Sequence, residues 1–504
     1  MFWGAMASPY CDAPIRKPCP GAIYQASGPS PFIKRVLTAM LDQLSCVLRL
    51  SWQAFLPASL VRCPPGLITC SALFTHVFLQ PVAAVDSETT ALQVGYCTNV
   101  HAGVELATIG DNLVRYSVPA REKLNQQIAQ QRQVPTQERL GVGLWIPDQA
   151  SQELMQSPQQ LQGFAELLAA NRLSAFTING FPFDNFHQPS VKQRVYLPTW
   201  ADRQRYEYTL RLASILAALL PESDETQTVG SISTLPLGWP ANPFAPGDSD
   251  SAEARFAKSG QQLRELAAQL NAIEQQTGKR IVVAIEPEPG CDLDSADDMI
   301  DFFYQQLPEQ THRRYLTICH DICHSAVMNE PQRDVIERYA QAGIAIGKVQ
   351  VSSAITVDWA SMAVADRPEV LARLSSFAED RYLHQTGQVD RQGDFKLATD
   401  LPELLAGIDP ATLDEVERWM IHFHVPIFLE QIGRLGTSRD AVRACLQAIG
   451  CCGDPNGFVP GVDFTGHLEV ETYAWTVLPE AERQRGLSDD IATEMFWLLQ
   501  QLYG

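Results

Sequence analysis

Nine short apolar runs, separated by stretches with helical periodicity, recur between residues 92 and 473 and constrain the fold more than any other feature. The runs span residues 92–97, 140–146, 175–179, 229–235, 281–285, 315–319, 344–351, 419–428 and 467–473. Most are continuously apolar rather than alternating, which indicates strands buried on both faces and hence a parallel sheet covered by helices. A strand–helix unit repeated about eight times predicts the α/β class and a (β/α)8 TIM barrel, with a doubly wound sheet as the alternative.

Nine runs for eight barrel strands imply that one run belongs to an insertion. Residues 354–418 are polar, mixed in pattern and far longer than an ordinary loop after a strand. We therefore predict a single barrel domain over residues 87–504, with a long insertion at about 354–418, between late strands.

Residues 1–86 are a different kind of sequence, rich in Pro, Ser and Cys and without a helical or strand period. We expect a disordered leader or a start codon placed too far upstream. Residues 66–85 are uncharged, as in a signal peptide or a membrane span, but His76, Pro81 and the distance from the first residue argue against both. The 12 cysteines show no repeated spacing, which favours reduced thiols in a cytoplasmic protein.

Composition and motifs exclude several functions. The formal charge is −20, and such a surface repels phosphate backbones, so nucleic acid is not an expected partner. The sequence contains no GxGxxG, P-loop, GxSxG or HExxH motif, so nucleotide-binding and serine-hydrolase chemistry have no support.

Carboxylates follow three of the expected strands, where TIM barrels build their sites. Glu286 ends a fully apolar strand and is costly to bury unless it is paired or bound to a metal. Asp321 and His324 form a D-x-x-H pattern that suits Mn²⁺, Zn²⁺ or Fe²⁺, although Asp321 is also suited to cap the next helix. Glu469 and Glu471 share one face of the last strand, where a metal or a substrate hydroxyl would explain both.

Strand seven has two candidates, residues 347–353 and residues 422–426. The first contains Lys348, which is unusual in an apolar strand and suits a carbonyl polariser, a phosphate contact or a partner for a carboxylate. In the second, His422 and His424 share one side, as metal ligands, substrate contacts or core histidines bonded to the backbone.

Amide and imidazole side chains follow the first strands, and such groups suit the wall of a small-molecule site. Asn99 and His101 follow the first strand, and Asn179 ends the third. His384 lies in the insertion, from which it would reach the site as part of a lid. These residues, together with His324, Lys348 and His422, are the predicted substrate contacts.

The order Glu286, D-x-x-H at 321–324 and Glu471 resembles the xylose-isomerase-like barrel superfamily of sugar isomerases, epimerases and apurinic endonucleases. From about residue 92 onward the chain resembles EboE-type metabolite traffic proteins more closely. The matching strings are GYCTNVH (95–101), FTINGFPF (176–183), GSISTLPLGW (230–239), AIEPEPGC (284–291), GKVQVSSA (347–354), YLHQ (382–385), HFHVPIF (422–428) and HLEVETYAW (467–475).

The resemblance implies a divalent metal (Mn, Zn, Mg, Fe or Co) held by Glu286, Asp321, a strand-seven residue and Glu471. Sugar epimerases usually have histidine on strand seven, whereas this chain offers Gln350 or, if the insertion displaces the strand, His424. The family implies the trafficking of a secondary metabolite with other proteins of one gene cluster, membrane-bound ones included.

Three functions follow as hypotheses. The first is a metal-dependent isomerase or epimerase of a small hydroxylated or sugar-like metabolite, with Glu286 and Glu471 as catalytic residues. The second is a metabolite-binding carrier on the same barrel, which fold alone does not distinguish. The third, a phosphodiester-cleaving enzyme, expects a basic groove that the acidic sequence lacks.

Overall fold

The computed structural model describes residues 92–504, except residues 132, 222–227, 246–249, 454–456 and 474–485. The predicted leader, residues 1–86, lies outside the described residues, so its character stays a prediction. All statements below concern the described part of the chain.

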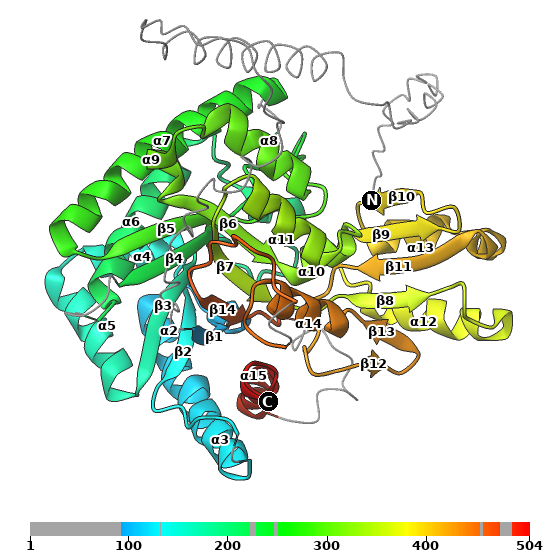
Figure 1. The fold of residues 1–504 in the computed structure, drawn as a ribbon, viewed down its shortest axis with the longest axis horizontal. Coiled ribbons are helices and arrows are strands. Elements are labelled where there is room, and N and C mark those ends of the chain that lie inside the picture. Colours follow the sequence, from blue (N-terminus) through cyan, green and yellow to red (C-terminus); the bar gives the residue numbers. More distant parts are fainter. Residues whose placement is uncertain (1–91, 132, 222–227, 246–249, 454–456, 474–485) are drawn as a thin grey trace, which may run out of the picture. The chain divides into compact units, whose positions relative to one another are not determined.

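Eight parallel strands of the described chain close into a barrel, which confirms the predicted fold class (Figure 1). Their order around the barrel is β1-β14-β7-β6-β5-β4-β3-β2. The strands are β1 (Gln93–Cys97), β2 (Leu140–Trp145), β3 (Leu173–Asn179), β4 (Val229–Thr234), β5 (Arg280–Ile285), β6 (Leu316–Asp321), β7 (Ile346–Val351) and β14 (His467–Val470). Each barrel strand lies beside the next barrel strand in the sequence, as a repeated strand–helix unit requires. This includes β7 and β14, which pair although a long stretch of chain separates them.

Helices surround the barrel and bury their apolar faces against it (Figure 1). They are α2 (Leu106–Asn112), α3 (Val118–Ala129), α4 (Asp148–Met155), α5 (Pro158–Ala170), α6 (Arg203–Leu219), α7 (Ala252–Thr277), α8 (Ala296–Gln306), α9 (Gln310–Arg313), α10 (Ile322–Val327), α11 (Gln332–Gln341), α14 (Arg439–Ala448) and α15 (Leu487–Tyr503). Helix α8 shows how the sequence sets a boundary, because Ser295 and Asp298 form a reciprocal capping box at its start.

A second sheet lies between β7 and β14 in the sequence and beside the barrel in space (Figure 1). Its order is β10-β9-β11-β8-β13-β12, and its strands pair antiparallel. The elements are β8 (Ile355–Asp358), α12 (Arg367–Phe377), β9 (Thr386–Asp390), β10 (Phe395–Ala398), α13 (Leu401–Gly407), β11 (Val416–Ile421), β12 (Gln431–Ile432) and β13 (Leu435–Thr437). The insertion thus extends past the interval 354–418 and takes in the apolar run 419–428.

This topology decides between the two candidates for strand seven. Strand β7 contains Lys348 and Gln350, and it pairs with β6 and β14. His422 and His424 instead follow β11, a strand of the second sheet. An apolar run of this length fits either kind of sheet, so the sequence pattern alone left both open.

The inside of the barrel carries a layer of buried polar side chains below the mouth. Lys348 and Glu469 are fully buried and form an ion pair across the neighbouring strands β7 and β14. Asn179 on β3 accepts a hydrogen bond from the Lys348 Nζ at 2.8 Å and donates to Glu469 Oε1 at 2.8 Å. Gly143 on β2 leaves the space for Glu469, since a Cβ there would lie 1.5 Å from the Glu469 Oε1. The layer forms a rigid polar floor for whatever lies above it.

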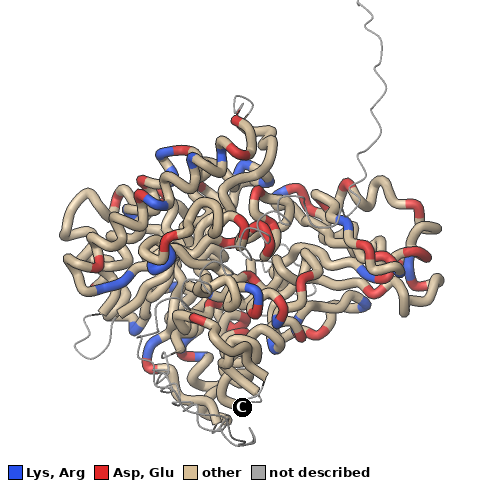
Figure 2. The backbone as a smooth tube through the Cα atoms, turned by 45° about the horizontal axis from the view of Figure 1, so that its top comes forward, with Lys and Arg blue, Asp and Glu red and all other residues tan. Residues whose placement is uncertain are grey.

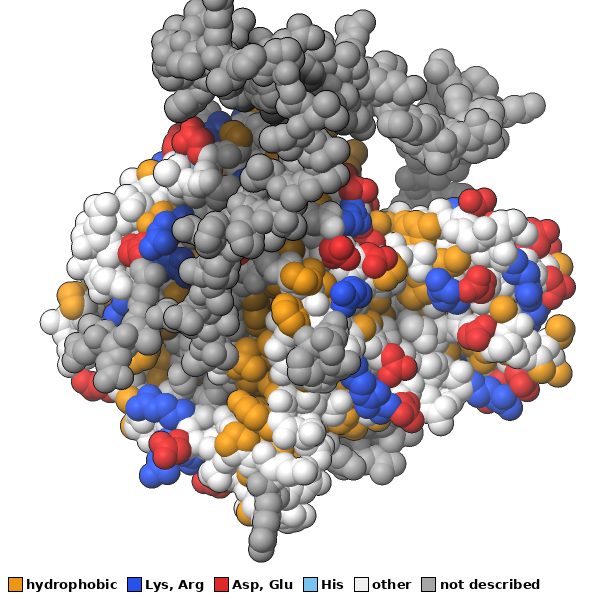
Figure 3. Space-filling view, viewed as in Figure 1, with side chains coloured by type: hydrophobic (Ala, Val, Ile, Leu, Met, Phe, Trp, Pro, Cys, Tyr) orange, Lys and Arg blue, Asp and Glu red, His pale blue; other side chains and the backbone are white. Residues whose placement is uncertain are grey.

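Charged positions of both signs are scattered along the backbone of the described residues in Figure 2. On the face in Figure 3, hydrophobic side chains form small groups among charged and polar ones. No helix of the described chain has the length and apolarity that crossing a membrane requires. The seven cysteines in this part of the chain form no disulfide with one another.

Candidate metal centre

Three carboxylates from three strand ends meet at the mouth of the barrel. Glu286 follows β5, Asp321 ends β6 and Glu471 follows β14, and one oxygen of each lies within 4.8 Å of the others. All three are buried. Three negative charges this close repel one another strongly away from water, so the cluster calls for protons or a cation.

The pKa values show how the cluster divides its charge. Burial, then Glu471 and Asp321, raises the pKa of Glu286 well above its usual range. Burial, then Asp321 and Glu469, raises the pKa of Glu471 to about 8. Burial would also raise the pKa of Asp321, but His324, His424 and two hydrogen bonds lower it below its usual value. Asp321 is therefore the ionised member, and Glu471 holds a proton at pH 7 unless a cation replaces it, while the pKa of Glu286 is raised in the same direction.

Asp321 combines the two roles that its sequence position suggested. Its Oδ1 caps α10 by accepting from the His324 backbone N–H at 2.8 Å, and it also accepts from the Ser352 hydroxyl at 2.9 Å. Its Oδ2 is buried and has no hydrogen-bond partner among the described residues. Since an unsatisfied buried carboxylate oxygen is costly, Oδ2 is suited to a ligand such as a metal ion.

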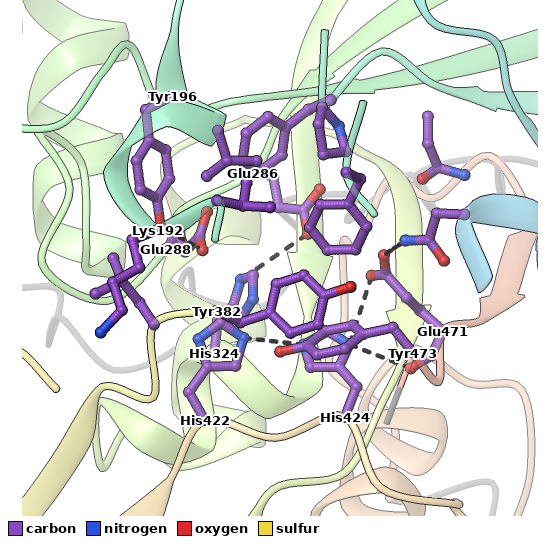
Figure 4. Close-up of a pocket in the computed structure, with 18 residues that line it drawn as sticks. Lys192, Tyr196, Glu286, Glu288, His324, Tyr382, His422, His424, Glu471 and Tyr473 are labelled. Carbon is purple, nitrogen blue, oxygen red and sulfur yellow. Dashed lines mark hydrogen bonds and ion pairs between the residues drawn. The ribbon is translucent and has the colours of Figure 1, made fainter. Parts of the chain in front are cut away.

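Three histidines face this cluster, and each is oriented in the same way (Figure 4). The Nδ1 atom of His324 lies 3.0 Å from the Pro287 carbonyl, that of His422 lies 2.7 Å from Gln385 Oε1, and that of His424 lies 3.2 Å from the Glu471 carbonyl. A carbonyl oxygen only accepts, so each Nδ1 carries a hydrogen, and a neutral ring then presents a lone pair on Nε2. Metal-binding histidines are typically held in this way by their second nitrogen.

The Nε2 atoms of His422 and His424 lie 3.2 Å apart. With hydrogens on both Nδ1 atoms, two lone pairs would face each other, and a proton or cation beside them removes that repulsion. Burial, then His324, lowers the pKa of His422 well below its usual value, and burial lowers the pKa of His424 to about 4 although Asp321 opposes this. Both rings are therefore neutral at pH 7, the form that binds metals.

Gln350 and His424, the two candidates for the fourth ligand, both remain close to the cluster. Gln350 pairs with Asp321 in the β6–β7 register, and it donates from Nε2 to Asn179 at 2.9 Å. Its buried Oε1 has no partner among the described side chains and backbone groups. The His424 Nε2 lies 3.9 Å from the Asp321 Oδ2. Asp321, His324 and His424 also form a group with ligand-like spacing.

The other predicted substrate contacts separate into two groups. Asn99 and Asn179 line the cavity with His324 and His422, and Asn99 donates to Glu471 Oε1 at 2.7 Å. Three others lie elsewhere. Lys348 is in the floor, His101 is bonded to Tyr96 and stacked on Tyr116, and His384 is stacked on Phe423. Each is buried and engaged by neighbours that only the tertiary structure reveals.

Sequence reasoning missed Glu288 and Tyr196. Glu288 lines the cavity, accepts from the Tyr196 hydroxyl at 2.7 Å on Oε1, and has no partner for its buried Oε2 within the described chain. It also forms a group of ligand-like spacing with His324 and His422. Its place two residues after Glu286, between prolines that fix the loop, was the available signal.

The raised pKa of Glu471 predicts a pH-dependent effect of Glu471→Gln on the metal-free protein. An unfolded glutamate ionises near pH ~4.3, so between that pH and about 8 the unfolded chain releases a proton that the folded chain keeps. The free energy of unfolding therefore falls as pH rises through this window, and glutamine removes the loss. We expect Glu471→Gln to lie close to the wild type near pH 5 and to gain about 4 kcal/mol over it by pH 8.5.

Urea denaturation in the presence of EDTA at both pH values measures this difference. Glu265→Gln, at an exposed position on α7, is the matched control and should show no pH-dependent difference. An equal effect of Glu471→Gln at pH 5 and pH 8.5 would contradict the prediction.

Among known proteins, only solved structures match this chain. No family model matches the sequence, and no curated protein matches it. Among solved structures, the chain is similar to a xylose isomerase-like TIM barrel protein from Mycobacterium smegmatis in complex with magnesium (9% identity, TM-score 0.42, covering 82% of this chain and 97% of that one). It is also similar to the probable 3-DHS dehydratase AsbF from Bacillus anthracis (14%, 0.38, 81% and 98%) and to the IOLI protein with a binding zinc atom (12%, 0.38, 82% and 99%).

Identities of 9–14% and TM-scores of 0.38–0.42 carry no argument about activity. The fold assignment rests on the closed strand order, and the function has to be argued from the site.

Proposed function

We propose that this chain is a metal-dependent isomerase or epimerase of a small hydroxylated, sugar-like metabolite. The observation that carries the proposal is the meeting of Glu286, Asp321 and Glu471 within 4.8 Å, under histidines that present their Nε2 atoms. The partnerless oxygens of Asp321 and Gln350 fit a cation better than a purely structural network. Carboxylate, amide and imidazole donors together suit a divalent ion such as Mn²⁺, Mg²⁺, Zn²⁺, Fe²⁺ or Co²⁺.

In this proposal, Glu286, Asp321, Glu471 and one of Gln350 and His424 hold the ion. A divalent ion bound there supplies positive charge that polarises substrate oxygens and makes an adjacent C–H bond more acidic. Glu286 and Glu471 approach the cavity from β5 and β14 and transfer a proton from and to a substrate carbon. Asn99 fixes the Glu471 carboxyl, and the Nε2 of His324 accepts a hydrogen bond from a substrate hydroxyl.

A carrier that binds the same metabolite without converting it is the second candidate, and the EboE-type resemblance favours it. In that case the chain would receive a secondary metabolite and pass it to other proteins of its cluster. Cytoplasmic location and cluster partners, membrane-bound ones included, remain predictions of the sequence. The same site residues serve both functions, so turnover is the property that separates them.

Deuterium exchange tests the proposed proton transfer directly. The chain is loaded with each candidate cation and incubated in D₂O with a panel of ketoses, aldoses and inositols, and NMR follows exchange at carbon. We expect exchange with at least one member, and a decrease of at least about 100-fold for Glu471→Gln, the size typical of losing a general base.

Glu265→Gln, the exposed control on α7, should keep the wild-type exchange rate. If the wild type and the variant both bind a panel compound saturably without deuterium exchange at carbon, the isomerase proposal is rejected in favour of the carrier. Exchange that persists in Glu471→Gln would remove Glu471 from the proton transfer.

A further inference from the structure

The cavity at the barrel mouth has two chemically different sides. The carboxylates and histidines form its inner side, and the outer side is a wall of aromatic and aliphatic side chains (Figure 4). The space between the lining atoms is about 630 Å³, which includes solvent at the open mouth. This division suits a ligand that is polar at one end and apolar at the other.

The wall is assembled from three parts of the chain that are distant in sequence. Phe186 comes from the segment between β3 and α6, Tyr382 from the insertion, and Tyr473 from the end of β14. Phe186 and Tyr382 are stacked with ring centroids 4.7 Å apart, and Tyr382 and Tyr473 are 5.3 Å apart. Val191 packs with them in a small hydrophobic cluster apart from the main core. The cluster closes the cavity with flat, rigid surfaces.

Polar side chains near the wall are already engaged with the protein. Lys192 forms an ion pair with Asp400 at 2.7 Å, and the Tyr196 hydroxyl donates to Glu288 at 2.7 Å. On the inner side, by contrast, the buried Oε2 of Glu288 has no partner in the described part of the chain, and the same holds for Oδ2 of Asp321 in the adjoining carboxylate cluster. Unsatisfied buried acceptors are thus concentrated on one side of the cavity, and the aromatic rings, which carry the Tyr382 and Tyr473 hydroxyls, lie on the other.

We propose that the natural ligand is amphiphilic, with vicinal oxygens that reach the carboxylate cluster and a planar apolar group that packs on Phe186, Tyr382 and Tyr473. The inference rests on the proposed metal-dependent function and narrows its substrate class. A fully hydroxylated sugar would place hydroxyls against the aromatic faces of the wall, whereas an aryl or unsaturated group gains apolar contact there. The insertion, which supplies Tyr382, adapts the barrel to such a ligand.

Two chelators that differ only in the apolar group test this inference. Acetohydroxamate and benzohydroxamate both offer a pair of oxygens to a divalent ion, and only the second carries a phenyl ring. Calorimetric titration of the chain loaded with Mn²⁺ or Zn²⁺, with metal content measured in each sample, gives both dissociation constants. We expect benzohydroxamate to bind about tenfold tighter or more, because the ring buries apolar surface.

Phe186→Ala should remove most of this advantage and leave acetohydroxamate binding unchanged. Tyr382→Leu keeps the packing volume apolar but removes the ring, so it provides a second variant should Phe186→Ala fold poorly. Tyr304→Ala, an exposed aromatic on α8, is the matched control and should keep the full advantage.

Equal affinities, or an advantage that persists in both wall variants, would overturn the inference and leave the metal-dependent function standing. If neither hydroxamate binds although the ion is present, the proposed chelation of substrate oxygens fails, and this inference fails with it.

Discussion

Asp321→Asn is expected to lower the affinity for a divalent cation by more than about 100-fold. The Asp321 carboxylate is the ionised member of the cluster, and its Oδ2 is the buried oxygen without a partner in the described structure. Asparagine keeps the capping interaction with the His324 backbone N–H, because aspartate and asparagine cap helices about equally well. The substitution therefore removes a charged ligand and preserves the start of α10.

Equilibrium dialysis against Mn²⁺, Zn²⁺ or Co²⁺, followed by elemental analysis, measures the effect. The wild type should hold about one ion per chain. The single variants Glu286→Gln and Asp321→Asn should each lose this ion. Asp334→Asn makes the same chemical change at an exposed position on α11 and should bind as the wild type does. Full occupancy in Asp321→Asn, with the fold intact, would reject the ligand assignment.

The strand-end carboxylates were predictable because the C-terminal ends of all barrel strands meet at one mouth. Once Glu286, Asp321 and Glu471 were placed after apolar strands, the rule that such ends converge brought them to one mouth. The rule needs no knowledge of side-chain packing. The same rule placed Asn99 and Asn179 beside the cavity, where the structure also has them.

The histidines could be named from the sequence but not placed. The apolar run before His422 and His424 fits a barrel strand as well as a strand of an added sheet, and only the pairing of β11 with β8 and β9 separates the two. The orienting role of Gln385 likewise depends on how the inserted sheet packs against the barrel. Contacts between segments far apart in sequence leave no local pattern to read.

Lys348 shows a similar limit in the barrel interior. Its place in an apolar strand indicated a special role, and a carboxylate partner was one of the alternatives the sequence left open. The β7–β14 register is what brings it to Glu469 rather than to a ligand. Burial alone would lower the pKa of the Lys348 ammonium, but Glu469 opposes this and the net pKa is raised, so Lys348 is charged at pH 7.

Lys348→Met is therefore expected to lower the free energy of unfolding by about 3–5 kcal/mol, the cost of leaving a buried charge without its partner. Glu469 is fully buried, fills the space above Gly143, and would retain only the donor from Asn179 Nδ2 at 2.8 Å. Urea denaturation at pH 7 with EDTA measures the loss without a contribution from metal binding. If Lys348→Met unfolds at the same urea concentration as the wild type, the ion pair does not stabilise the floor.

The double variant Lys348→Met/Glu469→Gln separates the charge from the shape of the side chains. Glutamine keeps the size of Glu469 and its acceptor for Asn179 but carries no charge, so the double variant should recover to within about 1 kcal/mol of the wild type. Metal affinity offers an independent readout, because Lys348 lies below the ligands and none of the cavity-lining atoms belongs to it. If the floor only supports the site, the double variant will bind the cation as the wild type does. A double variant that is stable yet binds no metal would instead show that the charge of the pair, and not its shape alone, sets the electrostatics of the carboxylates above it.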